Sequence, residues 1–328
     1  MQYFCTLFDS NYLSRGLAMY YSLEKHCTDF HLYVISFDDS SQSVLRQLNL
    51  KHATIISLEN FEDEELLRVK KDRTAGEYCW TCTSSSIWYC IHTFGLDHCT
   101  YVDADLLFFS DPKVLTDEMG ENSVLITEHR YSPEYDQSAL SGIYCVQFIT
   151  FKNTTAGLLA LDWWRKACIE WCYRRFEDGK FGDQKYLDDW TTRFESIHVL
   201  QHTGGGVAPW NSTQYSFQKS GNQVIVKTSI QEQSLVFFHF HDFRYCLDQV
   251  FRLTDEQYKL NSDAVSLVYK PYVQALSQAE STIKRVDQKI VFHEPLHSLS
   301  WVKTNFGRKL TFSIKGFYKN YYKQSKFR

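Results

Sequence analysis

Short apolar runs alternate with helix-like periodicity along the first part of the chain. The runs at residues 3–8, 31–37 and 53–58 each end at polar residues that favour a turn, as buried strands do. Apolar side chains recur every three or four residues over 13–26 and 44–48, as on one face of a helix. The order strand, helix, strand, helix, strand predicts a parallel sheet with right-handed crossovers.

The same alternation continues further along the chain. A fourth strand is expected to lead into Asp103, and the glycine-rich stretch at residues 201–206 is expected to be a flexible loop. The other elements expected are helices over 61–71, 81–94, 154–176, 183–187 and 265–286 and after Asp111-Pro112, strands over 123–127, 143–151, 224–226 and 235–238, and a loop over 73–76. We therefore expect an α/β domain over residues 1–250, with a mostly parallel central sheet flanked by helices, and a helical extension over 251–328.

Two aspartates, Asp103 and Asp105, follow the fourth predicted strand with one residue between them. Side chains alternate along a strand, so both carboxylates face the same side if the backbone stays extended. Such a pair inside an α/β core repels itself and resists burial, and a hard divalent cation removes that cost. The alternative is a solvated strand end whose aspartates cap the next turn, because the tripeptide alone is common.

Polar residues also follow the other predicted strands. Asp9 and Asn11 come after the first strand, and Asp38 comes after the second. Because ligands of open parallel sheets bind at the carboxyl ends of the strands, these side chains and the aspartate pair predict one site at that edge.

Composition narrows the class of protein. The chain has 328 residues, of which 44% are hydrophobic and 23% charged, so a folded globular domain is expected. The net charge of −4 argues against a nucleic-acid partner. The ten scattered cysteines match no zinc-ribbon spacing and favour buried, reduced thiols. The start of the chain lacks a basic leader, and no apolar run approaches the ~20 residues of a membrane span, so we expect a cytoplasmic protein.

The last part of the chain, residues 301–328, differs from the rest in charge. It holds six lysines and two arginines without an acidic residue, and aromatic residues are interleaved with them. This composition favours peripheral attachment to an anionic surface, the inner face of the cytoplasmic membrane. RNA binding and a solvated tail that packs its aromatics on the domain are the alternatives.

Four motifs resemble one family of enzymes. They are FCTLFDSNYLSRG, YVDADLLFF, FGDQKYLDDW and FFHFHDF, spread over about residues 1–245. Together they resemble the GT-A-fold glycosyltransferases, in particular the bacterial family 8-like enzymes. The resemblance implies a Rossmann-like GT-A fold and assigns a role to several residues of this chain.

By this resemblance Asp103, Asp105 and His239 bind the metal, Mn²⁺ or Mg²⁺. The catalytic residues would be Asp183, which holds the donor sugar, and Gln184, which lies beneath the reacting carbon. The full set of expected nucleotide-sugar-binding residues is Thr6, Asp9, Asn11, Tyr12, Arg73, Asp103, Ala104, Asp105, Gly142, Asp183 and His241.

The sequence departs from the family pattern at two places. Lys185 stands where the third motif has an aspartate, and Asp242 stands where the fourth motif has a glycine. The lysine that contacts the diphosphate in the family has no counterpart, so Arg73, Lys185 and Arg244 are candidates for the phosphates. Each histidine of the fourth motif has a second interpretation as a hydrogen-bonded core residue.

The resemblance implies a retaining, metal-dependent transferase that uses a nucleotide-sugar, expected to be a UDP-sugar. The expected acceptor is a saccharide or lipid-linked saccharide of cell-surface polysaccharide or lipopolysaccharide synthesis. One alternative is a sugar-nucleotide nucleotidyltransferase, which should carry a glycine-rich basic loop after the first strand. The other is a non-catalytic protein that binds carbohydrate or membrane.

Overall fold

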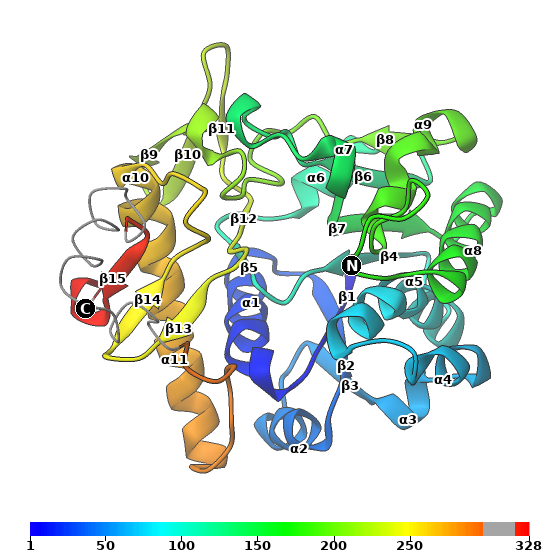
Figure 1. Cartoon of the computed structure of the whole chain (residues 1–328), viewed down its shortest axis with the longest axis horizontal. Coiled ribbons are helices and arrows are strands. Elements are labelled where there is room, and N and C mark those ends of the chain that lie inside the picture. The colour runs from blue at the N-terminus through cyan, green and yellow to red at the C-terminus, as the bar shows by residue number, and fades with distance from the viewer. Residues whose placement is uncertain (298–318, 328) are drawn as a thin grey trace.

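The computed structural model describes residues 1–297 and 319–327, and a seven-stranded sheet lies at its centre (Figure 1). The strand order is β3-β2-β1-β4-β7-β6-β8. Neighbouring strands run parallel except at β7, which is antiparallel to β4 and β6, so the predicted α/β fold with a mostly parallel sheet is confirmed. The strands are β1 (Gln2–Phe8), β2 (Phe30–Ser36), β3 (Ala53–Ser57), β4 (His98–Val102), β6 (Val124–Glu128), β7 (Tyr144–Lys152) and β8 (Ile197–Val199).

Helices cover both faces of this sheet, and successive side chains of a strand enter opposite hydrophobic clusters. In β1, Phe4 packs in one cluster and Cys5 in the other, as the alternation of a strand requires. The first cluster takes side chains from α1 (Leu13–His26), α2 (Asp39–Leu48), α6 (Lys113–Glu118) and α11 (Lys270–Val286). The second takes them from α3 (Leu58–Phe61), α4 (Glu64–Lys70), α5 (Ala75–Phe94), α8 (Thr155–Glu170) and α9 (Trp190–Arg193).

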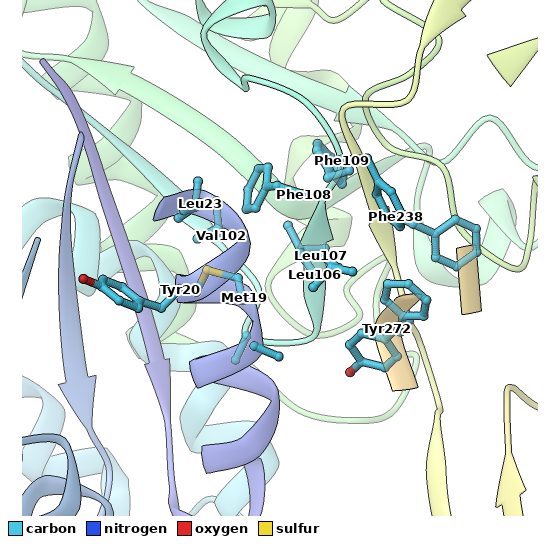
Figure 2. Close-up of a cluster of buried hydrophobic side chains, with 14 of the residues drawn as sticks. Met19, Tyr20, Leu23, Val102, Leu106, Leu107, Phe108, Phe109, Phe238 and Tyr272 are labelled. Carbon is cyan, nitrogen blue, oxygen red and sulfur yellow. The ribbon is translucent and has the colours of Figure 1, made fainter. Parts of the chain in front are cut away.

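Smaller antiparallel sheets extend the first face. The pair of β5 (Leu106–Phe108) and β12 (Phe237–His239) lies beside α1, and the core there joins α1, β5, β12 and α11 (Figure 2). The remaining strands form two three-stranded sheets, β9 (Ser216–Ser220) with β10 (Gln223–Lys227) and β11 (Glu232–Ser234), and β13 (Arg244–Cys246) with β14 (Val250–Arg252) and β15 (Tyr321–Lys323). Short elements complete the described chain: α7 (Ser138–Ser141), α10 (Ser262–Ala264), the π-turn η5 (Val265–Tyr269), and the 3-10 turns η1 (Ser10–Tyr12), η2 (Pro133–Tyr135), η3 (Gln184–Asp189), η4 (Ser212–Gln214) and η7 (Gln324–Phe327).

The end of the chain returns to the domain. Asn320 donates side-chain hydrogen bonds to two backbone carbonyls of the segment after β14, and Phe327 is buried in the first cluster. Part of the basic tail, residues 319–327, therefore packs on the domain, while the rest of 301–328 lies outside the described residues. The division at residue 250 stays a prediction. None of the described helices has the length and apolarity that crossing a membrane requires.

Several boundaries differ from the sequence prediction for local reasons. The helix expected over 61–71 is two helices, because Asp63 caps the start of α4. The expected loop at 73–76 is already the start of α5, where Thr74 and Glu77 form a capping box. The helix expected over 154–176 ends at Glu170, and the short strands β5, β8, β9, β11, β13, β14 and β15 were not expected.

The glycine-rich stretch is a loop, as expected, but its glycines are closely packed, which opposes the expected flexibility. A Cβ on Gly204 would lie 1.9 Å from the carbonyl oxygen of Ser234. Gly206 has a φ of +84°, which disfavours other residues, and a Cβ there would lie 2.6 Å from Thr127. The glycines let this segment approach β6 and β11 closely.

All ten cysteines lie among the described residues as free thiols, and nine of them are buried. The structure brings Cys5, Cys90 and Cys99 together from β1, α5 and β4, with their sulfur atoms within 4.8 Å of one another. The Cys5 sulfur is also 3.5 Å from the Ser86 hydroxyl. The Ser86 hydroxyl therefore gives the Cys5 thiol a hydrogen-bond partner inside the core.

Two glycines in first turns of helices provide a test of the packing. A Cβ on Gly157 of α8 would lie 2.3 Å from the backbone carbonyl of Lys152, whereas Gly76 of α5 has nothing within 4 Å. We expect Gly157→Ala to destabilise the fold by about 1–3 kcal/mol through overpacking. Gly76→Ala, the matched control, should stabilise it by about 0.5–1 kcal/mol, because alanine favours a helix. Thermal unfolding followed by circular dichroism measures both, and equal effects of the two changes would contradict this account of α8.

Candidate metal centre

The two aspartates lie in the turn between β4 and β5, at the carboxyl edge of the sheet. The backbone does not stay extended here: the Leu106 N–H donates to the Asp103 carbonyl at 3.3 Å, which makes a tight turn. The Asp103 N–H donates to the carbonyl of Gln147 on β7 at 3.1 Å. The two carboxylates therefore come together through a turn anchored on β7, and not through strand alternation.

Strand β12 brings the histidine to this turn. It pairs antiparallel with β5 so that His239 lies opposite Leu106. The Nε2 atom of His239 is 3.2 Å from Oδ1 of Asp105 and 3.8 Å from Oδ2 of Asp103. One ligand atom from each of these three residues lies within 4.8 Å of the others, so the predicted metal ligands do converge.

Neighbouring groups fix the histidine ring. Its Nδ1 atom is 2.8 Å from Oε1 of Gln147, and its backbone N–H donates to the carbonyl of Val207 at 2.9 Å. The side chain is almost fully buried. Because an amide oxygen can only accept, Nδ1 carries a proton, and Nε2 faces the two carboxylates.

The three groups shift one another's pKa values strongly. The pKa of Asp103 is raised to about 6, chiefly by burial and also by the charge of Asp105. The charge of His239 acts in the opposite direction. Burial would also raise the pKa of Asp105, but attraction to His239 and a hydrogen bond from it lower that pKa to about 2. Burial would lower the pKa of His239, yet the Asp105 carboxylate raises it well above its ordinary value. The protein thus places a positive charge between two carboxylates, where a cation fits.

The donor set suits a divalent metal ion. Two carboxylates and one imidazole give two oxygens and one nitrogen, a set that Mn²⁺ accepts well and the strictly oxygen-seeking Mg²⁺ less well. The hydrogen bond on Nδ1 is the outer-shell contact that metal-binding histidines usually have.

A second acidic group lies close to the aspartate pair. Asp183, immediately before η3, is 3% exposed, and its Oδ2 atom has no hydrogen-bond partner in the part of the chain that the structure describes. Its pKa is raised to about 7, chiefly by burial and also by the charge of Asp103. A hydrogen bond from Thr83 acts in the opposite direction. A buried carboxylate oxygen without a partner is costly unless a ligand satisfies it, so Asp183 is suited to receive a hydroxyl group.

Residues after Asp183 hold a neighbouring segment in place. The Gln184 amide donates to the carbonyl of Ser141 at 2.8 Å. Gly142 has a φ of +101°, and a Cβ there would lie 3.0 Å from a carboxylate oxygen of Asp188. Gln184 and Gly142 therefore meet where α7 packs against η3.

Residues after β1 lie at the same edge. The Asn11 amide donates to the Asp9 carboxylate at 2.8 Å, and Asp38 accepts from the Ser10 N–H at 2.8 Å. Burial raises the pKa of Tyr12, Arg15 lowers it and Asp105 raises it. The charge of Asp105 is therefore among those that act on the Tyr12 hydroxyl.

Four other predicted residues have different surroundings. Thr6 and Ala104 are buried, and the Thr6 hydroxyl has no hydrogen-bond partner. Arg73 is engaged at the end of α8, where it donates to the Ile169 carbonyl and lies 3.9 Å above the ring of Tyr173. His241 is exposed, with its ring centroid 5.7 Å from that of His239. The binding roles of these residues stay predictions.

Sequence reasoning missed two contributions to the site. Gln147 is a long polar side chain within the largely apolar run of β7, and this was the available signal. Arg15 of α1 is 1% exposed and makes a double hydrogen bond with Glu294. The sequence could not predict this pair, because the two residues lie far apart along the chain. Arg244 is shared between Asp242 at 2.8 Å and Glu294 at 3.6 Å.

Comparison with solved structures finds distant similarity to several sugar-transferring enzymes. The galactosyltransferase LgtC aligns with 84% of this chain and 96% of its own, at 12% identity and a TM-score of 0.48. The bifunctional glycosyltransferase WbbM aligns with 87% of this chain and 51% of its own, at 11% identity and a TM-score of 0.49. The glycosyltransferase GlyE of Streptococcus pneumoniae TIGR4 aligns with 63% of this chain and 46% of its own, at 15% identity and a TM-score of 0.40.

Sequence comparison finds nearer relatives in Bacillus subtilis strain 168, although no family model matches the chain. The uncharacterized protein YfnF is 28% identical over 249 residues, which are 74% of this chain and 81% of YfnF. The uncharacterized protein YfnD is 32% identical over 280 residues, which are 83% of this chain and 87% of YfnD. At this identity and coverage, the chain belongs to the same family as YfnD.

Proposed function

We propose that the chain is a metal-dependent glycosyltransferase that moves a sugar from a nucleotide-diphospho-sugar to a saccharide acceptor. The observation that carries this proposal is the convergence of Asp103, Asp105 and His239. Asp183 is influenced by the charge of Asp103, and its buried Oδ2 atom has no hydrogen-bond partner among the described residues. A nucleotide-sugar would supply a ligand to each part of this site. Its diphosphate would bind a cation held by Asp103, Asp105 and His239, and its sugar hydroxyl groups would bind Asp183. The four motifs that resemble GT-A enzymes support the same chemistry.

Each group of residues then has a distinct task. Asp103, Asp105 and His239 would hold the cation, which stabilises negative charge on the departing diphosphate. Asp183 would accept a hydrogen bond from the donor sugar through its unpartnered oxygen. Gln184 cannot ionise, so it would orient the sugar and would not act as a base. Asp9, Asn11 and Tyr12 would bind the base and ribose at the neighbouring strand end.

Finer features of the proposal rest on the resemblance and on the donor set. UDP as the nucleotide, retention at the sugar carbon, and an acceptor in surface polysaccharide or lipopolysaccharide synthesis follow the family pattern. Mn²⁺ is favoured over Mg²⁺ because an imidazole is among the ligands. The competing nucleotidyltransferase should carry a phosphate-binding loop after the first strand, but η1 and α1 follow β1 at once, with one glycine, Gly16, inside the helix.

Removing one metal ligand tests the proposal. We expect Mn²⁺ and a UDP-sugar together to raise the melting temperature of the wild type, because ligands that bind the native state stabilise it. Asp105→Asn should weaken Mn²⁺ binding at least about tenfold and abolish the metal-dependent shift. The measurement is a melting panel of UDP-, GDP- and CMP-sugars with and without Mn²⁺.

Asp111→Asn is the matched control, because Asp111 is exposed and lies a few residues further along the chain. It should leave the shift unchanged. A shift that persists in Asp105→Asn, or that ignores chelators in the wild type, would contradict the metal centre. Release of pyrophosphate from a sugar-1-phosphate and UTP would instead identify a nucleotidyltransferase.

The raised pKa of Asp183 predicts a pH dependence of stability. Its pKa is about 7 in the folded protein and its ordinary value is 3.8, so the native state takes up a proton as the pH falls. The associated stability is complete below about pH 4 and is lost as the pH rises through 7. Relative to Asp183→Asn, the metal-free wild type should lose on the order of 2–4 kcal/mol between pH 5 and 8.5.

Melting temperatures across this pH range measure the effect. Asp72→Asn changes an exposed aspartate and should follow the wild type at every pH. Parallel curves for wild type and Asp183→Asn would show that the Asp183 carboxyl is not held protonated.

The basic tail supports a proposal of membrane attachment. The variant that tests it changes basic residues before residue 319 and so leaves the packed end intact. Replacing four basic residues by glutamine should release the protein from phosphatidylglycerol vesicles, because each contributes about 1 kcal/mol near an anionic surface. The residues to change are Lys303, Arg308, Lys309 and Lys315, and the control changes the exposed Lys25, Lys51, Lys71 and Lys219. Vesicle sedimentation measures binding, and equal loss in both variants would indicate a general charge effect and refute attachment through the tail.

A further inference from the structure

We propose that Gln147 is a positioning residue that prepares His239 to bind the metal. The inference rests on the proposed function, because it concerns the same metal centre. Gln147 lies on β7, is fully buried, and touches two of the three ligands through different groups. Its backbone carbonyl accepts from the Asp103 N–H at 3.1 Å, and its side-chain oxygen is 2.8 Å from Nδ1 of His239.

The chemistry of imidazole explains why this contact matters. A neutral imidazole has one protonated nitrogen and one with a lone pair, and only the latter binds a metal. The Gln147 Oε1 atom can only accept, so it keeps the proton on Nδ1 and leaves Nε2 for the cation beside Asp105. If the proton sat on Nε2, it would point at the place where the metal belongs.

The surroundings of Gln147 show that its polarity serves no other side chain in the described structure. Its amide nitrogen is buried and has no hydrogen-bond partner. A Cβ on Gly206 would lie 3.3 Å from that nitrogen, so the glycine gives it room. An unpartnered buried N–H group costs stability, and an apolar residue would suit the apolar run of β7 better. The contacts to the metal ligands account for a glutamine here.

The experiment measures Mn²⁺ and Mg²⁺ binding to the full chain by electron paramagnetic resonance, with Mg²⁺ as competitor. Gln147→Leu should weaken Mn²⁺ binding about 10- to 100-fold, as the loss of outer-shell contacts to metal ligands does. Mg²⁺ binding, which relies on oxygen ligands, should weaken less. Gln147→Glu restores an acceptor for Nδ1 and should bind Mn²⁺ within about threefold of the wild type or more tightly.

Thr150→Val is the matched structural control. Thr150 lies on the same strand, is 1% exposed, and its hydroxyl is 2.8 Å from that of Thr100 on β4. The change removes a buried hydrogen bond between β7 and β4 and should leave the Mn²⁺ to Mg²⁺ preference unchanged. If Gln147→Leu does not accumulate as folded protein, Gln147→Asn takes its place, because the shorter amide does not reach Nδ1.

Three results would overturn the inference in distinguishable ways. Wild-type Mn²⁺ affinity in Gln147→Leu, together with lost affinity in His239→Ala, would leave the metal centre standing and remove the role of Gln147. Wild-type affinity in His239→Ala would remove the imidazole from the metal centre, and the positioning role would fail with it. If Gln147→Leu and Thr150→Val weakened the binding of Mn²⁺ and of Mg²⁺ to the same extent, Gln147 would have a structural role only.

Discussion

Two carboxylates that must stay close together at the edge of a buried sheet set the central constraint of this structure. Asp103 and Asp105 repel each other, and their partial burial removes the water that would weaken the repulsion. The fold answers by placing His239 against both, which raises the pKa of the histidine and lowers that of Asp105. A divalent cation held by these residues would compensate the same charges more completely and would let the imidazole give up its proton. The geometry needed for the metal therefore also stabilises the metal-free chain.

The antiparallel strand β7 makes this geometry possible. A parallel strand beside β4 would end at the carboxyl edge, whereas β7 begins there and runs back through the sheet. Its first residues can therefore support the turn that carries the aspartates, and Gln147 does so with both backbone and side chain. The pairing of β12 with β5 then adds the third ligand from a distant part of the sequence. One reversal of strand direction thus lets a single buried residue contact two metal ligands.

Sequence periodicity predicted the α/β class and the first three strands, because these depend on local patterns of burial. The spacing of the two aspartates indicated a pair, but the turn that brings their carboxylates together was not expected. Periodicity failed where tertiary contacts decide. The glycines of 201–206 suggested mobility, but backbone approaches such as that of Gly204 to Ser234 explain them. His239 entered the site through the resemblance alone, since spacing along the chain cannot show that β12 pairs with β5. Gln147 was detectable as a polar residue in an apolar run, but its partner was not.

If the proposed function is right, charge pairing around the centre favours a cation over an arginine as the group that would balance a bound diphosphate. Arg15 is buried and doubly hydrogen-bonded to Glu294, so moving it toward a phosphate would leave a buried carboxylate unpaired. Arg244 is divided between Asp242 and Glu294, which reduces the charge it offers to a ligand. Because the lysine of the GT-A motif has no counterpart in this chain, the proposed electrostatic task would rest more on Asp103, Asp105 and His239. A ligand set with two carboxylates and one well-oriented imidazole is suited to that task because it binds the ion firmly while leaving coordination positions for phosphate oxygens.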